Sequence, residues 1–264
     1  MATILLRFLF FIFLGLPLLS FAGILVTGKL THELNLSANQ TVDDSILISN
    51  DSDKPQMVKV TLADYSFNSQ GQTQFLEKGA LDRSNASWIQ TNRMQFEVPA
   101  KSTYTFPFTI KVPNNKQLSG SYWSIFLVEP IVSSIKNPEE KDAIGIQTVI
   151  RYGVQVVANI GNKGIYELKI LEKSLEEKED KKIFALSVEN CGTVLQSPKM
   201  AVEFVSKTNK FVKRIEGQQQ RIYPDCSVKY NLDVSALPKG KYKAMVFLDH
   251  GEEALFGAKY DVEI

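Results

Sequence analysis

Few residues in this 264-residue chain have the types and spacing that catalysis or metal binding requires. Only two histidines occur, His32 and His250, and they lie in different halves of the sequence. Carboxylates gather in runs such as EEKED at 176–180, which are typical of a solvated surface. The sequence contains no His-Glu-x-x-His, no Gly-x-Ser-x-Gly and no phosphate-binding glycine loop. It therefore predicts a protein that is not an enzyme and that has no metal or cofactor.

The first 22 residues resemble a secretory signal peptide. Arg7 precedes a long apolar run, and the small residues Ser20 and Ala22 follow two positions apart, so we expect cleavage after Ala22. A retained membrane anchor is the alternative, because the run approaches the roughly 18–20 apolar residues that a membrane span needs. Pro17 and the Ser-x-Ala ending favour cleavage. The mature protein is then exported, to the periplasm first or the cell surface second, and does not span the membrane.

Export changes the interpretation of the two cysteines, Cys191 and Cys226. In an oxidising compartment, two cysteines in one half of a chain most simply form one disulfide. A metal site would need more ligands, and a reactive thiol would need a basic partner, for which His250 is the only histidine in that half. We therefore predict a structural disulfide between Cys191 and Cys226.

The elements that would position any binding residue are strands. The segment AIGIQTVIRYGVQVVANI at 143–160 alternates apolar with small, polar or charged residues, which predicts one long strand bending near Gly153. Arg151 falls on one face of this strand. The other face carries the isoleucines Ile144, Ile146 and Ile150.

The rest of the chain consists of two similar halves on either side of that strand. VPAKSTYTFPFTIKVPNNKQLSGSYWSIFLVEP in the first half matches the pattern of YPDCSVKYNLDVSALPKGKYKAMVFLDHG in the second. Short alternating segments with turn residues between them, and no convincing helix, predict an all-β fold of two tandem immunoglobulin-like β-sandwich domains. We place these domains at 23–160 and 161–264, with the junction within 159–164.

Composition and one strand indicate the kind of partner. A net charge of +1 and 44% hydrophobic residues describe a globular protein without the basic excess of a nucleic-acid-binding protein. Both faces of the segment around Trp123 are apolar or aromatic. Either Trp123 is buried in the domain or under the polar segment 66–87, for which we expect at most a short strand, or this region exposes an apolar edge to a protein partner.

Two segments together resemble a known family. SYWSIFLVEPI, then a charged loop, then IGIQTVIRYGVQVVANI is similar to the end of the first domain of the PapD-like periplasmic chaperones of the chaperone/usher pilus pathway. ILISN followed by a proline-containing turn resembles an early strand and turn of that family. The resemblance implies an L-shaped pair of immunoglobulin-like domains that lends a strand to incomplete pilus subunits and caps their grooves.

Individual residues take roles from this resemblance. Ile144, Ile146 and Ile150 would fill the groove of the subunit, and Arg151 would hold the carboxylate at its C-terminus. The family has a second anchoring arginine on an early strand, where this chain has Glu33 and Leu34, and the insert at 66–87 is unlike a standard member. From sequence alone, the isoleucines equally fit a domain core of their own.

A second resemblance competes with the first. SNASWIQTNRMQFEVPAKSTYTFPFTIKVP followed by SGSYW is similar to the first domain of two-domain Gram-positive surface proteins that interact with WxL-domain proteins. The first resemblance predicts a chaperone-like protein that caps fibre subunits by β-strand addition. The alternative is a non-catalytic adhesive or structural protein of the cell envelope. In both cases the partner is a protein, and neither a nucleic acid nor a small-molecule substrate is expected.

Overall fold

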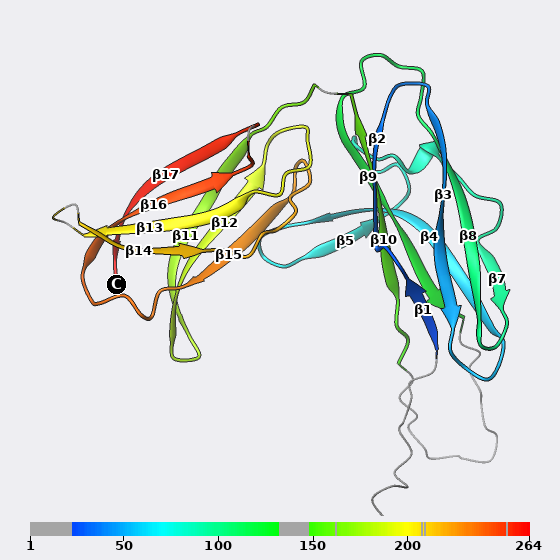
Figure 1. Cartoon of the computed structure of the whole chain (residues 1–264), viewed down its shortest axis with the longest axis horizontal. Coiled ribbons are helices and arrows are strands. Elements are labelled where there is room, and N and C mark those ends of the chain that lie inside the picture. The colour runs from blue at the N-terminus through cyan, green and yellow to red at the C-terminus, as the bar shows by residue number, and fades with distance from the viewer. Residues whose placement is uncertain (1–22, 132–147, 162, 207, 209, 252) are drawn as a thin grey trace, which may run out of the picture.

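The computed structural model of the chain describes residues 23–131, 148–161, 163–206, 208, 210–251 and 253–264. In these residues the regular structure is almost entirely β, with one short 3-10 helix, so the predicted all-β class is confirmed. Figure 1 shows two β-sandwich domains side by side. No helix among the described residues is long and apolar enough to cross a membrane. The predicted signal peptide at 1–22 lies outside the described residues.

The first domain is built from the strands that precede residue 161. Its elements are β1 (Ile24–Thr27), β2 (Thr31–Leu36), β3 (Thr41–Asn50), β4 (Gln56–Phe67), β5 (Thr73–Leu76), η2 (Ala86–Trp88), β6 (Ile89–Gln90), β7 (Gln95–Val98), β8 (Ser102–Lys111), β9 (Gly120–Pro130) and β10 (Tyr152–Ile160). One sheet has the order β1-β3-β8-β6. The other has the order β2-β10-β9-β4-β5, with β7 paired to β4.

The second domain contains the remaining strands. They are β11 (Leu168–Lys178), β12 (Lys181–Asn190), β13 (Lys199–Ser206), β14 (Phe211–Glu216), β15 (Ser227–Asp233), β16 (Lys241–Asp249) and β17 (Leu255–Glu263). They form the sheets β11-β12-β15 and β14-β13-β16-β17. β11 and β12 form a hairpin whose tight turn is at residues 179–180. Glu179 and Asp180 both have positive φ there, at 49° and 60°.

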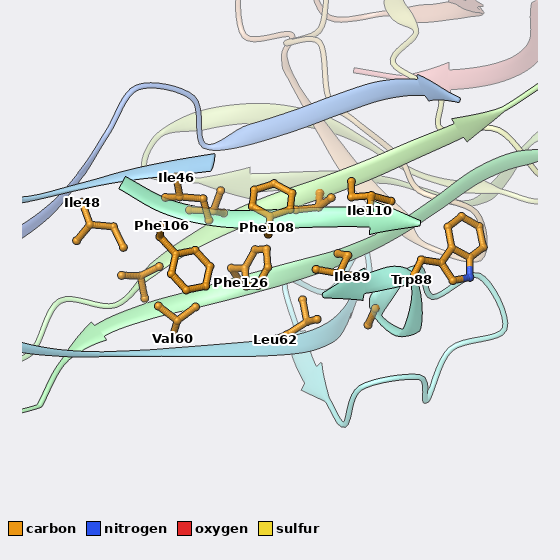
Figure 2. Packing of buried hydrophobic residues seen from close by; sticks show 14 of the residues in the cluster. Ile46, Ile48, Val60, Leu62, Trp88, Ile89, Phe106, Phe108, Ile110 and Phe126 are labelled. Atoms are coloured by element: carbon orange, nitrogen blue, oxygen red, sulfur yellow. The ribbon is translucent and has the colours of Figure 1, made fainter. Parts of the chain in front are cut away.

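Alternating apolar residues from the two sheets of each domain form its core. In the first domain, Phe126 of β9 packs edge-on against Phe106 of β8 with ring centroids 5.5 Å apart, and Val60 and Leu62 of β4 lie beside them (Figure 2). In the second domain, Phe184 of β12 packs against Phe204 of β13 at 5.9 Å. Each sandwich thus buries one face of both its sheets, as the alternation in sequence requires.

The strand predicted over 143–160 is shorter than expected. β10 begins at Tyr152, residues 148–151 have no regular secondary structure, and residues 143–147 lie outside the described part. β10 pairs with β9 in one unbroken register from Tyr152 to Ile160, so no bulge or break in the pairing marks the predicted bend near Gly153.

The segment 66–87 contains the short strand that was expected of it. β5 forms a hairpin with β4, and Figure 1 shows this hairpin reaching toward β15 of the second domain. The backbone N–H of Ser69 at its tip donates to the hydroxyl of Ser227, at 2.9 Å. The β4–β5 hairpin of the first domain therefore contacts the second domain at its tip.

Candidate functional site

β10 has an open edge because the N-terminal segment is divided between the two sheets. β1 pairs with β3 in one sheet, the chain then turns at Gly28, where φ is +90°, and β2 joins the other sheet. β2 pairs with β10 only from Gln155 to Ile160, whereas β9 covers β10 from Tyr152 onward. The stretch Tyr152 to Val154 therefore has a neighbouring strand on one side only among the described residues.

Backbone groups on this edge are available for pairing. The amide of Gln155 points to the β2 side, since it donates to the carbonyl of Leu30 at 2.9 Å. Amides alternate direction along a strand in an antiparallel pair, so the amide of Gly153 points to the same side. No strand pairs with it there in the described chain. Gly153 thus presents a free donor at the point where β2 stops.

Exposed apolar side chains border the open edge. Ile150 is 56% exposed and Val149 is 43% exposed, just before β10 begins. Leu30, just before β2 begins, is 48% exposed. Of the predicted binding isoleucines, only Ile150 lies in the described residues, and Ile144 and Ile146 lie outside them. Unpaired backbone next to exposed apolar side chains is the arrangement that strand addition uses.

Arg151, the predicted carboxylate anchor, already has an acidic partner within the chain. Its guanidinium donates from Nε to Oε2 of Glu129 at 2.7 Å, and Nη2 lies 2.6 Å from the same oxygen. The arginine side chain is 51% exposed. An ion pair in this setting contributes about 0–1 kcal/mol, so a competing carboxylate displaces Glu129 at little cost and with little net gain.

One face of the sheet that contains β10 packs against the second domain. We call the buried residues at this contact the interdomain cluster. This buried cluster consists of Ala63, Tyr65, Trp123, Ile125, Leu127 and Val157 from the first domain and Leu195, Tyr223 and Cys226 from the second. Trp123 is 2% exposed, its ring lies 4.9 Å from that of Tyr223, and its Nε1 donates to the carbonyl of Tyr65. Phe67 and Leu81 of the segment 66–87 pack against this cluster, and the amide of Trp123 donates to the carbonyl of Arg83, so the prediction that this segment helps to bury Trp123 is confirmed. The contribution of the second domain had not been predicted.

Polar contacts extend the interdomain cluster. Nη2 of Arg221 lies 2.8 Å from Oε2 of Glu33 on β2, and the hydroxyl of Tyr223 donates to Oε1 of Gln155 on β10. Glu33 occupies the region where the resembled family has an arginine. In this chain that position links the two domains, since the cation comes from Arg221 of the second domain.

A close backbone approach forms a third contact between the domains. The amide of Ser121 donates to the carbonyl of Thr193 at 2.8 Å, and the hydroxyl of Ser121 accepts from the amide of Leu195 at 2.8 Å. Gly120 has φ of +80°, and a Cβ there would collide with the Thr193 carbonyl oxygen. Glycine at 120 is therefore required for the second domain to sit this close to β9.

The predicted disulfide is not formed, because Cys191 and Cys226 are both free thiols. The amide of Asn190 donates to the carbonyl of Cys226, so the next residue, Cys191, points away from Cys226. Cys226 lies in the interdomain cluster and Cys191 is exposed. Burial raises the pKa of Cys226 to about 11, which keeps this thiol protonated and unreactive at neutral pH.

The histidines make structural contacts. Nδ1 of His32 lies 2.7 Å from Oδ2 of Asp44, between β2 and β3, and His250 lies against the ring of Tyr166 at 5.2 Å. Across the described residues, no group of three or more histidines, cysteines or carboxylates is arranged to hold a metal ion.

Sequence reasoning missed several residues of this region. Nothing in the local sequence marks Leu30 as the residue beside which the covered part of β10 begins. Arg221 and Tyr223 lie in RIYPDC, at the start of the repeated pattern of the second half, and no motif there indicates a contact with the first domain. Their roles depend on how the domains pack, which local patterns do not encode.

Comparison with solved structures agrees with the architecture. A chain from a chaperone–tip adhesin complex of CFA/I fimbriae biogenesis matches with a TM-score of 0.50 and 13% identity, covering 91% of this chain and 98% of that one. The two proteins share one fold. The fold implied by the PapD-like resemblance is thus confirmed.

Two further solved structures match at lower scores. The class 5 fimbriae chaperone CfaA has a TM-score of 0.47 at 12% identity, over 90% of this chain and 98% of its own. The E. coli chaperone DraB has a TM-score of 0.42 at 12% identity, over 92% of this chain and 98% of its own. No protein-family model and no curated protein sequence matches this chain.

Proposed function

We propose that this chain is an exported, non-catalytic chaperone that binds fibre or pilus subunits in the periplasm by β-strand addition. The observation that carries the proposal is the open edge of β10 from Tyr152 to Val154, bordered by exposed Ile150 and Leu30. The fold shared with a chain of a chaperone–tip adhesin complex supports the same function.

Binding would begin with the backbone. A client strand that lies along the edge of β10 ahead of the part that β2 covers would pair with the amide of Gly153 and with the residues that precede it. Main-chain hydrogen bonds of this kind tolerate many client sequences, and alternate side chains select among them. Ile144, Ile146 and Ile150 are the side chains that we propose for the client's apolar groove.

The apolar contacts should dominate the binding free energy. Burying one isoleucine contributes about 1.5–3 kcal/mol before ordering costs. A charge-assisted hydrogen bond contributes a similar gross amount, about 1.5–3 kcal/mol. Arg151 would obtain it only by exchanging Glu129 for a client carboxylate, so its net contribution is smaller.

The test compares two charge insertions at exposed apolar sites. Ile150→Asp lies beside the open edge, and Leu47→Asp, at a residue that is 41% exposed on β3 in the other sheet, is the matched control. We expect Ile150→Asp to lose client subunits in affinity purification from the periplasm, Leu47→Asp to retain them, and Arg151→Ala to weaken recovery by less than Ile150→Asp. Thermal unfolding midpoints of all variants should stay close to that of the parent.

Two results would oppose the proposal. Equal client recovery by Ile150→Asp and Leu47→Asp would remove the β10 edge as the binding site. Fractionation of assembled fibres that finds this chain as a stoichiometric component would favour the alternative, a structural or adhesive envelope protein.

A further inference from the structure

A pocket lies between the two domains, on the face of the β10 sheet that packs against the second domain. We call this face of the sheet the cleft face. The pocket has a volume of about 390 Å³ and is lined by Tyr65, Phe67, Thr73, Phe75, Ile125, Gln155, Arg221 and Tyr223. The β4–β5 hairpin supplies one wall, the second domain another, and β9 and β10 the floor. We call it the elbow pocket. Its size falls in the range of about 300–1,000 Å³ that is usual for binding pockets.

The walls of the elbow pocket are aromatic and fixed in place. Tyr223 packs against Tyr65 at 5.6 Å and against Phe67 at 6.0 Å. The hydrogen bond from Ser69 to Ser227 holds the hairpin against the second domain. Phe75 is the exception, because half of its surface, 50%, is exposed. A half-exposed aromatic at the rim of an otherwise buried aromatic pocket leaves apolar surface to be covered.

The charged group of the pocket is already neutralised. The guanidinium of Arg221 pairs with Glu33 at 2.8 Å, and Gln155 accepts the hydroxyl of Tyr223 at 2.7 Å. An anionic occupant would have to displace Glu33. Two buried polar groups of the lining, Nε of Arg221 and the hydroxyl of Tyr65, have no hydrogen-bond partner among the described residues. Because the cation itself is already paired, the lining still fits an apolar or aromatic side chain better than a carboxylate.

The open edge of β10 ends at this pocket. Gln155, which lines the pocket, is the first residue covered by β2, and Gly153 is the last cleft-facing residue whose edge is free. Leu127 and Ile125, cross-strand from Gly153 and Gln155, belong to the interdomain cluster, so Gly153 faces the cleft. Directly opposed residues on paired strands point to the same face. A client residue opposite Gly153 would therefore point to the cleft as well.

Because Gly153 has no side chain, no atom of this residue lies between the open edge of β10 and the pocket. A Cβ at this position would lie 2.8 Å from Cδ1 of Ile125, so any larger side chain would occupy the notch between the edge and the pocket floor. We propose that the elbow pocket receives an apolar, preferably aromatic, side chain from the client strand, carried by the residue that pairs opposite Gly153. This proposal rests on the proposed strand addition and adds a specificity site to it.

The test uses synthetic strand peptides of alternating Val and Thr in which one cleft-facing position at a time is Ala or Phe. We expect one position at which the Phe peptide binds the full chain about tenfold more tightly than the Ala peptide, as burial of an aromatic side chain predicts. Phe75→Ala and Gly153→Leu should abolish this preference. Phe211→Ala, at an aromatic residue of β14 that is 57% exposed, should preserve it.

The two levels of the proposal fail in different ways. If the peptides bind the parent and Ile150→Asp weakens them, but the preference for Phe is equal in the parent, Phe75→Ala and Gly153→Leu, the elbow pocket is not a binding site. If no peptide binds, or binding ignores Ile150→Asp, strand addition itself fails and the pocket proposal with it. Thermal unfolding identifies any variant that is misfolded, and Phe75→Ala changes a side chain whose loss the fold tolerates because it is half exposed.

Discussion

At the scale of residues, one thiol and two phenols that could ionise are buried between the domains, where they pack against apolar side chains. Cys226, Tyr65 and Tyr223 carry ionisable groups, yet all three lie in the interdomain cluster. Burial raises the pKa of each one, because the charged form would lose its hydration. The neutral forms then contribute apolar area to the contact between the domains.

Cys226 predicts how stability depends on alkaline pH. Its pKa is raised from 9.0 to about 11 in the folded state, so the folded protein holds this proton more tightly than the unfolded chain does. The resulting stabilisation is complete below pH 9 and is lost as the pH rises toward 11, by at most about 2–3 kcal/mol. Chemical unfolding at several pH values should show this loss in the parent and less of it in Cys226→Ala.

The comparison between the two proteins isolates the thiol, because every other group titrates in both. Identical pH dependence in the parent and in Cys226→Ala would show that Cys226 is not buried as described. Alkylation should agree with this result, since Cys191 is exposed and should react in the folded protein, although burial and the nearby Glu189 raise its pKa, whereas Cys226 should react only after unfolding.

At the scale of elements, β9 serves both domains. One of its faces fills the core of the first domain with Phe126 and Val128, while the other carries Trp123, Ile125 and Leu127 to the second domain. This is why both faces of its sequence are apolar. The start of the strand, at Gly120, fixes the distance to the second domain.

Gly120→Ala should separate steric collision from backbone strain. Gly120 and Gly71 have nearly equal φ, +80° and +79°, but only Gly120 has neighbouring atoms that a Cβ would meet. Gly71→Ala should cost about 1–3 kcal/mol of unfolding free energy, the usual range for such backbone strain. Gly120→Ala should cost more, and the amide of Ser121 should exchange faster because its bond to Thr193 is broken.

Denaturant unfolding combined with hydrogen exchange measures both effects. Equal costs for the two glycine variants, with Ser121 still protected, would contradict the close approach of Thr193 to β9.

Much of the fold followed from sequence patterns, and the contacts that build the site did not. Alternation identified the strands and their class, because side chains alternate wherever a sheet has one buried face. It predicted one long strand at 143–160, whereas β10 begins at Tyr152. Residues 148–151 alternate as a strand does but pair with no neighbouring strand among the described residues, and pairing cannot be read from alternation. It also assigned Cys191 and Cys226 to a disulfide from the expected compartment, whereas strand register sets their directions.

At the scale of the whole molecule, two sandwiches are joined by apolar and polar contacts over one sheet face. Trp123 and Tyr223 lie at the centre of this contact, and the β4–β5 hairpin and the Arg221–Glu33 pair lie beside it. The open edge of β10 and the elbow pocket therefore keep a constant relation to each other as long as the interdomain cluster is intact.

Tyr223→Ala should loosen this junction. The sequence has two tryptophans, so a Trp88→Phe background leaves Trp123 as the only one. In that background Tyr223→Ala should shift the Trp123 emission to longer wavelength and increase the radius measured by small-angle X-ray scattering, since water would reach the cluster. Tyr104→Ala, on β8 in the first domain, should change neither; a red shift in Tyr104→Ala alone would contradict the assignment.

The central claim is that an incoming strand pairs with β10 where β2 stops. Two amides on the same edge of β10 test it, because Gln155 is bonded to Leu30 whereas Gly153 has no strand beside it. Hydrogen exchange read by NMR should show Gln155 protected and Gly153 exchanging rapidly in the free protein. On binding of the subunit recovered by affinity purification, Gly153 should become protected and Gln155 should not change. Rapid exchange at Gly153 in the saturated complex would show that the client binds elsewhere and would overturn strand addition at this edge.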